Sequence, residues 1–183
     1  MEYKTGYHNP EDRNWWYEEG VKREKLFVDK IVPLIGMEGR IILNPAKEVD
    51  PKLPDLLCDG NIADLKSIFT PFFKAKRFKI DGVECDPRFT ITFNRKDYIR
   101  YNELYPDIDI YLWVHWQTLY GYNVVVDPLM AIYHIPFYQL ADDIEKGLYP
   151  LHAYKNRTDD NRNAKDSYVV DVRRLHEIGR LVG

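Results

Sequence analysis

The sequence has few cysteines, no long apolar run and no strong charge of either sign, and each lack removes a class of protein. Two cysteines in 183 residues are too few for a disulfide framework or a multi-cysteine zinc site. The N-terminus has no apolar signal core, and no run of about 18 apolar residues occurs, so we expect a soluble, cytoplasmic protein without a membrane partner. The formal net charge of -3 does not itself indicate nucleic-acid binding, so such a partner has to be inferred from local clusters.

The motifs of several enzyme classes are also missing. The five histidines lack metal-ligand spacing, which removes support for a zinc hydrolase. No Gly-rich phosphate loop is present, and no serine is framed by a nucleophile-elbow pattern. Neither ATP chemistry nor acyl transfer is therefore indicated.

The composition is that of one compact α/β domain. Hydrophobic residues make up 45% of the chain, charged residues 30% and aromatic residues 14%, which allows a sizeable core. We expect a flexible lead-in over residues 1–14 and a single domain over residues 15–183. Within it the pattern predicts helices at 15–35, 95–106 and 136–147, strands at 39–44, 53–67, 89–94, 107–117 and 122–127 (the last two paired around Gly121), a loop or short helix at 70–87, and a strand or helix at 169–181.

The segment 53–67 (LPDLLCDGNIADLKS) is typical of two short strands joined by a tight turn. The Asp-Gly pair at 59–60 favours a type I′ hairpin, because that turn needs positive φ at both central residues. With this turn Asp55 lies opposite Asp64, and Lys66 shares the face of Asp64. Like charges that face each other destabilise a sheet, which predicts a cation beside the two carboxylates. Lys66 could supply part of that charge, and a hard divalent ion could supply it more completely.

Glu24 is the one charged residue in the middle of the apolar face of the helix predicted at 15–35. At about 100° per residue, the residues on this face are Tyr17, Gly20, Val21, Phe27, Val28, Ile31 and Ile35. An unpaired carboxylate on a face that packs against the core is costly. Glu24 therefore also requires a cation.

A helix with an inward Glu24, a strand, a strand at Pro54-Asp55 and a strand with Asp64-Leu65-Lys66 resembles the PD-(D/E)XK nuclease superfamily. The resemblance covers roughly residues 15–67, and the later strands are compatible with it. It implies a restriction-endonuclease-like α/β fold, with a mixed central sheet flanked by helices.

The resemblance also implies a site and a reaction. Glu24, Asp55 and Asp64, with the carbonyl of Leu65, would hold Mg²⁺ or Mn²⁺, and Lys66 would position or deprotonate the attacking water. A metal lowers the pKa of its bound water and neutralises charge on the scissile phosphate, while an ammonium stabilises hydroxide. We therefore expect a magnesium-dependent deoxyribonuclease in restriction, repair or a phage-type role. RNA stays open as a substrate, and a homodimer would allow both strands to be cut.

Two basic clusters are candidates for phosphate contact, with a solvated surface as the alternative for each. The first, which we expect to bind nucleic acid, consists of Lys74, Lys76, Arg77 and Lys79; the second consists of Lys155, Arg157, Arg162, Lys165, Arg173 and Arg174. Two other classes of function are open. One is a non-catalytic nucleic-acid- or partner-binding domain with the same fold, and the other is a structural protein whose carboxylates form a buried ion-pair cluster.

Overall fold

A computed structural model describes residues 13–153 and 166–183, with side chains described from residue 18 onward. Most of the predicted lead-in lies outside these residues, and the chain is already helical at Arg13. Helix α1 (Arg13–Leu26) continues into a π-helical turn (Phe27–Ile31) and a 3₁₀ turn (Pro33–Ile35). The helical pattern predicted at 15–35 is therefore confirmed, although its second half is not a regular α-helix.

The centre of the molecule is a six-stranded mixed sheet with the order β1-β2-β3-β7-β10-β13. Strand β3 is parallel to β7, and every other neighbouring pair in this sheet is antiparallel. The strands are β1 (Ile41–Leu43), β2 (Leu56–Cys58), β3 (Asn61–Ile68), β7 (Asp109–His115), β10 (Met130–Pro136) and β13 (His176–Val182). The predicted α/β class with a mixed central sheet is confirmed at this level.

The remaining elements form a smaller sheet, two further helices and two short hairpins. The smaller sheet has the order β11 (Leu151–His152), β12 (Ser167–Asp171) and β6 (Thr90–Asn94). The helices are α2 (Arg95–Leu104) and α3 (Phe137–Glu145), and the hairpins are β4 (Lys79–Ile80) with β5 (Val83–Glu84) and β8 (Tyr120–Gly121) with β9 (Val124–Val125). Short 3₁₀ turns lie at η3 (Pro45–Glu48), η4 (Ala75–Arg77), η5 (Pro87–Phe89) and η6 (Val172–Arg174).

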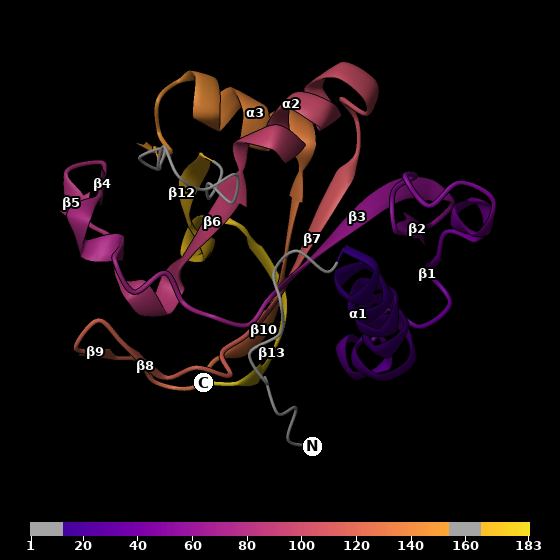
Figure 1. The fold of residues 1–183 in the computed structure, drawn as a ribbon, viewed down its shortest axis with the longest axis horizontal. Coiled ribbons are helices and arrows are strands. Elements are labelled where there is room, and N and C mark those ends of the chain that lie inside the picture. Colours follow the sequence, from indigo (N-terminus) through magenta and orange to yellow (C-terminus); the bar gives the residue numbers. More distant parts are fainter. Residues whose placement is uncertain (1–12, 154–165) are drawn as a thin grey trace.

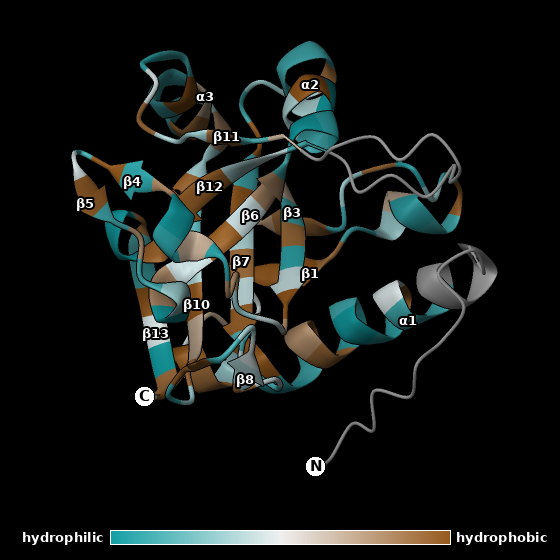
Figure 2. Cartoon of the chain, turned by 60° about the vertical axis from the view of Figure 1, so that its left-hand side comes forward, coloured by the Kyte–Doolittle hydropathy of each residue, from teal (hydrophilic) through white to brown (hydrophobic). Residues whose placement is uncertain are grey.

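Helices cover both faces of the central sheet, because its middle strands are apolar on both sides. In β7, Tyr111 and Trp113 face the core that α1 closes, while Ile110, Leu112 and Val114 face the core that α2, α3 and the smaller sheet close. Figure 1 shows α1 on one side of the sheet and α2 with α3 on the other. Hydrophobic residues concentrate along the central strands, whereas α1 is mostly hydrophilic until its C-terminal end (Figure 2). Strands buried on both faces read as nearly continuous apolar runs, as β7 does.

The structure corrects one of the predictions along the chain and refines two others. The strand at 107–117 does not pair with the segment 122–127; it pairs with β3 and β10, because its two apolar faces require a central position. The segment 70–87 contains the β4–β5 hairpin besides the short turn η4, and 169–181 forms the end of β12 and most of β13.

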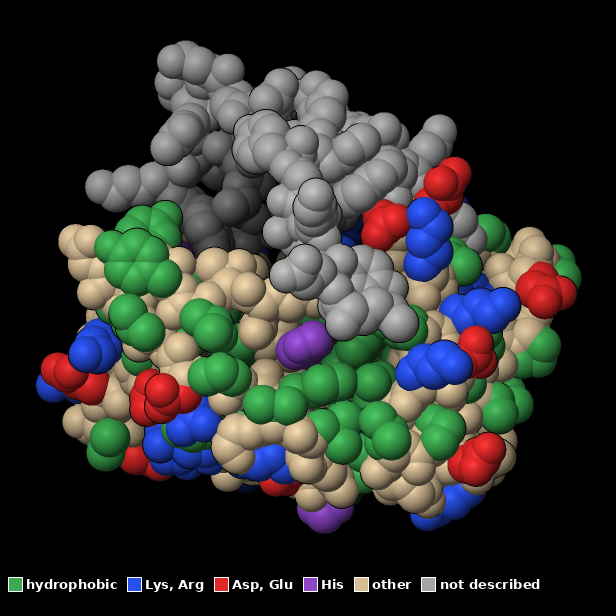
Figure 3. All heavy atoms as spheres, turned by 90° about the horizontal axis from the view of Figure 1, so that it is seen from below, with side chains coloured by type: hydrophobic (Ala, Val, Ile, Leu, Met, Phe, Trp, Pro, Cys, Tyr) green, Lys and Arg blue, Asp and Glu red, His purple; other side chains and the backbone are tan. Residues whose placement is uncertain are grey.

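The surface carries exposed hydrophobic side chains in addition to charged ones. On the face that Figure 3 presents, hydrophobic side chains form a broad group, with basic and acidic side chains around it. No helix within 13–153 or 166–183 has the length and apolar character needed to cross a membrane.

Candidate active site

The β2–β3 hairpin has the register that the sequence predicts. Asp59 and Gly60 form its turn with φ of 48° and 85°, and Leu56 pairs with Ala63. Arg40 holds the turn from outside, since its Nη2 lies 2.7 Å from an oxygen of Asp59. Asp55 immediately precedes β2, and Asp64 lies in β3, next to the last paired residue on its side of the hairpin.

Asp64 and Lys66 project from β3 toward α2 and form a direct ion pair. The distance from Lys66 Nζ to Asp64 Oδ2 is 2.8 Å, and Lys66 is also 3.1 Å from Asp97 Oδ2 in α2. Asp64 is 2% exposed, and the fully buried Tyr101 donates its hydroxyl to Oδ2 at 2.6 Å. Arg100 Nη2 lies 3.6 Å from the other oxygen. Asp64 is therefore a fixed carboxylate that cations and a phenol surround.

These contacts set the charge states of the pair. Burial by itself raises the pKa of Asp64, but the Lys66 ammonium, with hydrogen bonds from Lys66 and Tyr101, holds that pKa below its usual range. Burial lowers the pKa of Lys66, but the charges of Asp64, Tyr101 and Asp97, together with the hydrogen bond to Asp64, outweigh burial, so the pKa of Lys66 lies well above its usual value. Both groups are charged at neutral pH.

Glu24 and Asp55 meet at a second cation, Lys47. Both carboxylate oxygens of Glu24 lie 2.7 Å from Lys47 Nζ, and Asp55 Oδ1 accepts a further hydrogen bond from the same ammonium. Lys47 belongs to the turn η3. The side chain of Asn44, the residue before this turn, connects it to the segment that precedes β2. The Asn44 side chain accepts the N–H of Ala46 and donates to the carbonyl of Pro54, so the turn is fixed beside Asp55.

The two groups of charges are adjacent along β3. Asp55 Oδ2 accepts the backbone N–H of Leu65 at 3.3 Å, and Leu65 lies between Asp64 and Lys66. Burial, then the charges of Asp64 and Glu24, raise the pKa of Asp55 to about 6, against the opposing effect of Lys47. Asp55 is therefore a carboxylate whose charged form is disfavoured first by burial and then by the neighbouring negative charges.

The structure thus places the predicted site residues as two linked pairs. Asp64 and Lys66 are in contact, and Glu24 and Asp55 are joined through Lys47. The backbone N–H of Leu65 contacts Asp55, and the role of the Leu65 carbonyl as a metal ligand stays a prediction. Among the residues with described positions, no three His, Cys, Asp or Glu side chains form a group that could hold a metal ion.

Sequence reasoning missed Lys47, Asp97, Arg100 and Tyr101. The last three carry a readable signal, because positions i, i+3 and i+4 of a helix lie on one face and α2 follows an Asp-x-Lys strand. Lys47 carries none, since its place depends on how a 3₁₀ turn folds back against β2.

The predicted basic cluster lies apart from these carboxylates. Lys74, Lys76, Arg77 and Lys79 belong to η4, its N-cap and β4, near the β4–β5 hairpin at the end of the molecule away from α1 and β2 (Figure 1). The interleaved phenylalanines Phe72, Phe73 and Phe78 belong to the core cluster or pack against it. Their aromatic rings therefore serve packing.

Only two residues of the second basic cluster can be placed. Arg173 and Arg174 form ion pairs with Asp171 and Asp81. The other four members, at positions 155, 157, 162 and 165, lie outside the described residues. The placed arginines are thus already neutralised by carboxylates.

Comparison of the chain with protein-family models, curated protein sequences and solved structures finds no match. The site therefore has to be interpreted from its own geometry and chemistry.

Proposed function

We propose that this chain is a metal-dependent nuclease of the PD-(D/E)XK type, with a restriction-endonuclease-like fold, that hydrolyses phosphodiester bonds in DNA. The observation that carries the proposal is the convergence of Glu24, Asp55 and the Asp64–Lys66 pair at one end of the β2–β3 hairpin. The inward carboxylate comes from the first helix, and the two aspartates come from consecutive strands, as in the resemblance drawn from the sequence. Strand β7 follows α2 in the chain and pairs in parallel with β3, and this arrangement supports the same topology.

The carboxylates of Glu24 and Asp55 are oxygen donors of the type that Mg²⁺ and Mn²⁺ prefer, although no third carboxylate completes a metal-binding group with them in the described residues. Carboxylate oxygens are the ligands that hard divalent cations prefer, and Glu24 with Asp55 would hold the ion, with Asp64 as the neighbouring carboxylate. When bound, the metal supplies a lowered pKa to its water and neutralises charge that develops on the phosphate. The raised pKa of Asp55 is consistent with this role, because burial, then the charges of Asp64 and Glu24, disfavour the charged carboxylate more than Lys47 stabilises it, and a bound cation would relieve this cost.

The protein's own residues then divide the remaining work. Lys66 acts as an ammonium that orients the water and stabilises negative charge, since Asp64 keeps it protonated. Tyr101 fixes the orientation of Asp64 through its hydroxyl, and Asp97 restrains Lys66 from the side of α2. These contacts hold the pair in place before substrate arrives.

Lys47 favours a second candidate function. Its ammonium already pairs with Glu24 and Asp55, so the site is compensated without a metal, as expected of a non-catalytic nucleic-acid- or partner-binding domain. In the nuclease, a divalent ion has to displace this ammonium. The two functions therefore differ in whether a metal competes with Lys47.

The deciding experiment is cleavage of plasmid, linear duplex, single-stranded and branched DNA, and of RNA, in Mg²⁺, Mn²⁺ or EDTA. We expect metal-dependent cleavage that is lost in Asp64→Asn and Lys66→Ala. The matched controls are Asp142→Asn and Lys146→Ala, which change an Asp–Lys pair at the C-terminal end of α3 whose side chains are 53% and 70% exposed. Circular dichroism of each variant identifies any that fails to fold. No cleavage of any substrate by wild type, together with no calorimetric uptake of Mg²⁺ or Mn²⁺, would overturn the proposal in favour of a binding domain.

Cutting both strands of a duplex would require two copies of this site, so a homodimer belongs to the same proposal. Its test is the molar mass of the protein in solution, measured by light scattering with and without uncut DNA. A strictly monomeric protein on DNA would limit the nuclease to one strand per binding event.

A further inference from the structure

The β8–β9 hairpin ends in two residues with left-handed backbone. Its turn consists of Tyr122 and Asn123, with φ of 50° and 61°. Such turns normally carry Asn or Gly, because a bulky side chain at positive φ is strained. Tyr122 is nevertheless placed there with 71% of its surface exposed. A strained backbone position that carries an exposed aromatic side chain is a reason to look for a function.

The hairpin is held firmly against the core. Gly121 lies directly on the ring of Phe73, so close that an added Cβ would be 2.6 Å from Phe73 Cδ2. Next to the hairpin, Val126 donates its N–H to the carbonyl of Leu119 at 2.9 Å. The Tyr122 ring is therefore presented from a rigid base.

A hollow of about 280 Å³ lies between this hairpin and η4. Phe73 and Val124 contribute apolar walls, Asn123 an amide, and Tyr122 an aromatic ring. Its basic residues are Lys74, Lys76 and Arg77.

The charge of this hollow is positive and uncompensated. None of its lining residues is acidic, and in the described part of the chain none of its three cations has an ion-pair partner. Lys74 Nζ lies 4.4 Å from the centroid of the Tyr122 ring. Burial, then the charges of Lys74 and Arg77, lower the pKa of nearby His152, which reports the positive potential there. These groups suit a ligand that combines an anionic group with a flat ring.

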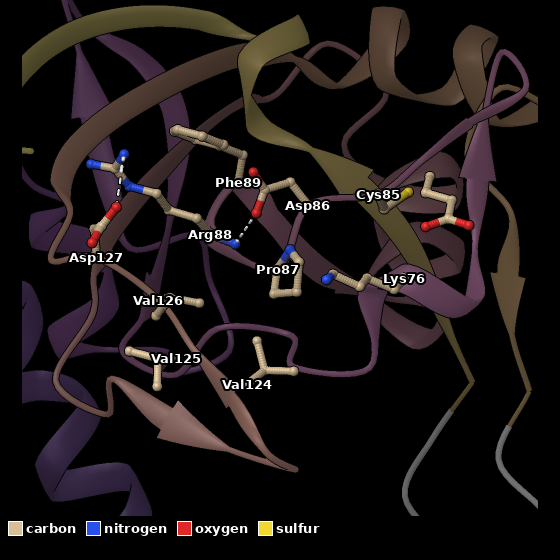
Figure 4. A pocket seen from close by; sticks show the side chains of 11 residues that line it. Lys76, Cys85, Asp86, Pro87, Arg88, Phe89, Val124, Val125, Val126 and Asp127 are labelled. Atoms are coloured by element: carbon tan, nitrogen blue, oxygen red, sulfur yellow. Dashed lines mark hydrogen bonds and ion pairs between the residues drawn. The ribbon is translucent and has the colours of Figure 1, made fainter.

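The neighbouring hollow provides a contrast. It measures about 450 Å³ and shares Lys76 and Val124 with the first, but its rim carries carboxylates. Figure 4 shows Arg88 paired with Asp127, and Asp86 bonded to the backbone of the η5 turn. Of its two cations, Arg88 is paired with Asp127, and Lys76 is shared with the first hollow, so an anion is better held on the side of Tyr122.

We propose that the hollow beside Tyr122 binds one unpaired nucleotide of the nucleic acid, with the base stacked on the Tyr122 ring and the phosphate held by Lys76 and Arg77. An aromatic side chain stacks on any exposed base face, whereas paired bases in a duplex offer none. The inference rests on the proposed function for the class of ligand, and it adds that the substrate carries single-stranded nucleotides. Because this hollow lies away from the carboxylates, it supplies affinity and not chemistry.

The test is the dissociation constant for a fluorescently labelled oligothymidylate in EDTA, measured by anisotropy. We expect Tyr122→Ala to weaken binding by at least about five-fold, the low end of measured base stacking, and Tyr122→Phe to bind like wild type. Lys76→Ala and Arg77→Ala should each reduce the slope of log K against log salt by about 0.7. Tyr138→Ala is the control, since Tyr138 is 63% exposed on α3, and it should change nothing.

Three results would overturn the inference. The first is that wild type does not bind the oligonucleotide. The second is that Tyr122→Phe loses as much affinity as Tyr122→Ala. The third is that Tyr122→Ala loses as much affinity for a blunt duplex as for the single strand. Thymidine monophosphate should compete with the oligonucleotide, and competition that Tyr122→Ala leaves unchanged would also contradict the site. The binding assay contains EDTA and therefore does not depend on cleavage. Binding that depends on Tyr122 supports this inference even if wild type cleaves no substrate in the separate cleavage assay. Absence of cleavage there counts against the proposed nuclease only.

Discussion

The raised pKa of Asp55 predicts that its charge destabilises the folded protein, so that Asp55→Asn is more stable than wild type above pH 7. The rise from the ordinary 3.8 to about 6, at about 1.4 kcal/mol per pH unit, corresponds to about 3 kcal/mol. The side chain is 17% exposed, so screening by water reduces this figure little. The effect of the Lys47 ammonium is already contained in it.

The pH dependence has a definite sign. Well below pH 3.8 Asp55 is protonated in both states, and the two proteins approach equal stability. As the pH rises toward 6, the unfolded chain ionises first and the folded state keeps its proton, so wild type loses stability relative to the variant. Above pH 7 the difference should be constant at about 3 kcal/mol.

The measurement is urea unfolding in EDTA from pH 3 to 8, followed by the fluorescence of tryptophans that include the buried Trp113 and Trp116. The exposed Asp107→Asn is the control, and its stability should follow wild type throughout. A difference between Asp55→Asn and wild type that stays near zero over the whole range, or that favours wild type above pH 7, would refute the reasoning. Added Mn²⁺ should stabilise wild type and not Asp55→Asn, since a functional carboxylate that costs stability recovers it with its ligand.

Three further substitutions test other parts of the structure. Lys47→Ala should lose about 3–5 kcal/mol in EDTA because two largely buried carboxylates keep no cation. Thermal melts should show a larger gain with Mn²⁺ than in wild type, and an equal gain would mean that Lys47 does not compete with the metal. Tyr101→Phe should lose about 1.5–3 kcal/mol in urea unfolding, the value of a hydrogen bond to a charged group, and should slow cleavage by releasing Asp64; unchanged stability would remove Tyr101 from that role. Gly121→Ala should lose about 1–3 kcal/mol because its methyl group overlaps the Phe73 ring, and a melt like that of wild type would disprove the close contact.

Local patterns predicted the hairpin and the inward carboxylate. An Asp-Gly pair between apolar segments restricts φ at the turn, and a side-chain period of two then places Asp64 and Lys66 on one face of β3. A period of 3.6 likewise turns Glu24 toward the core. These properties depend on a few consecutive bonds, so the sequence suffices for them.

Strand pairing over long distances was less accessible. The predicted pairing of 107–117 with 122–127 was wrong because two apolar faces make β7 a central strand, and the choice of β3 and β10 as its neighbours depends on the packing of the whole domain. The basic residues 74–79 follow the hairpin closely in sequence, yet the chain carries them to the far end of the molecule (Figure 1). Residues that are close in sequence to the hairpin are distant from it in space, because the length of β3 separates them.

The sequence by itself therefore determined the α/β class, the hairpin and the shared face of Asp64 and Lys66, because these follow from backbone dihedrals and side-chain periodicity. Only the tertiary structure decided which cation each carboxylate meets. Lys47 reaches Glu24 and Asp55 from a turn that Asn44 fixes, and Tyr101 reaches Asp64 from a helix 37 residues away in the chain. Charge compensation in a buried site depends on distances of a few ångströms between separate elements, and packing alone sets those distances.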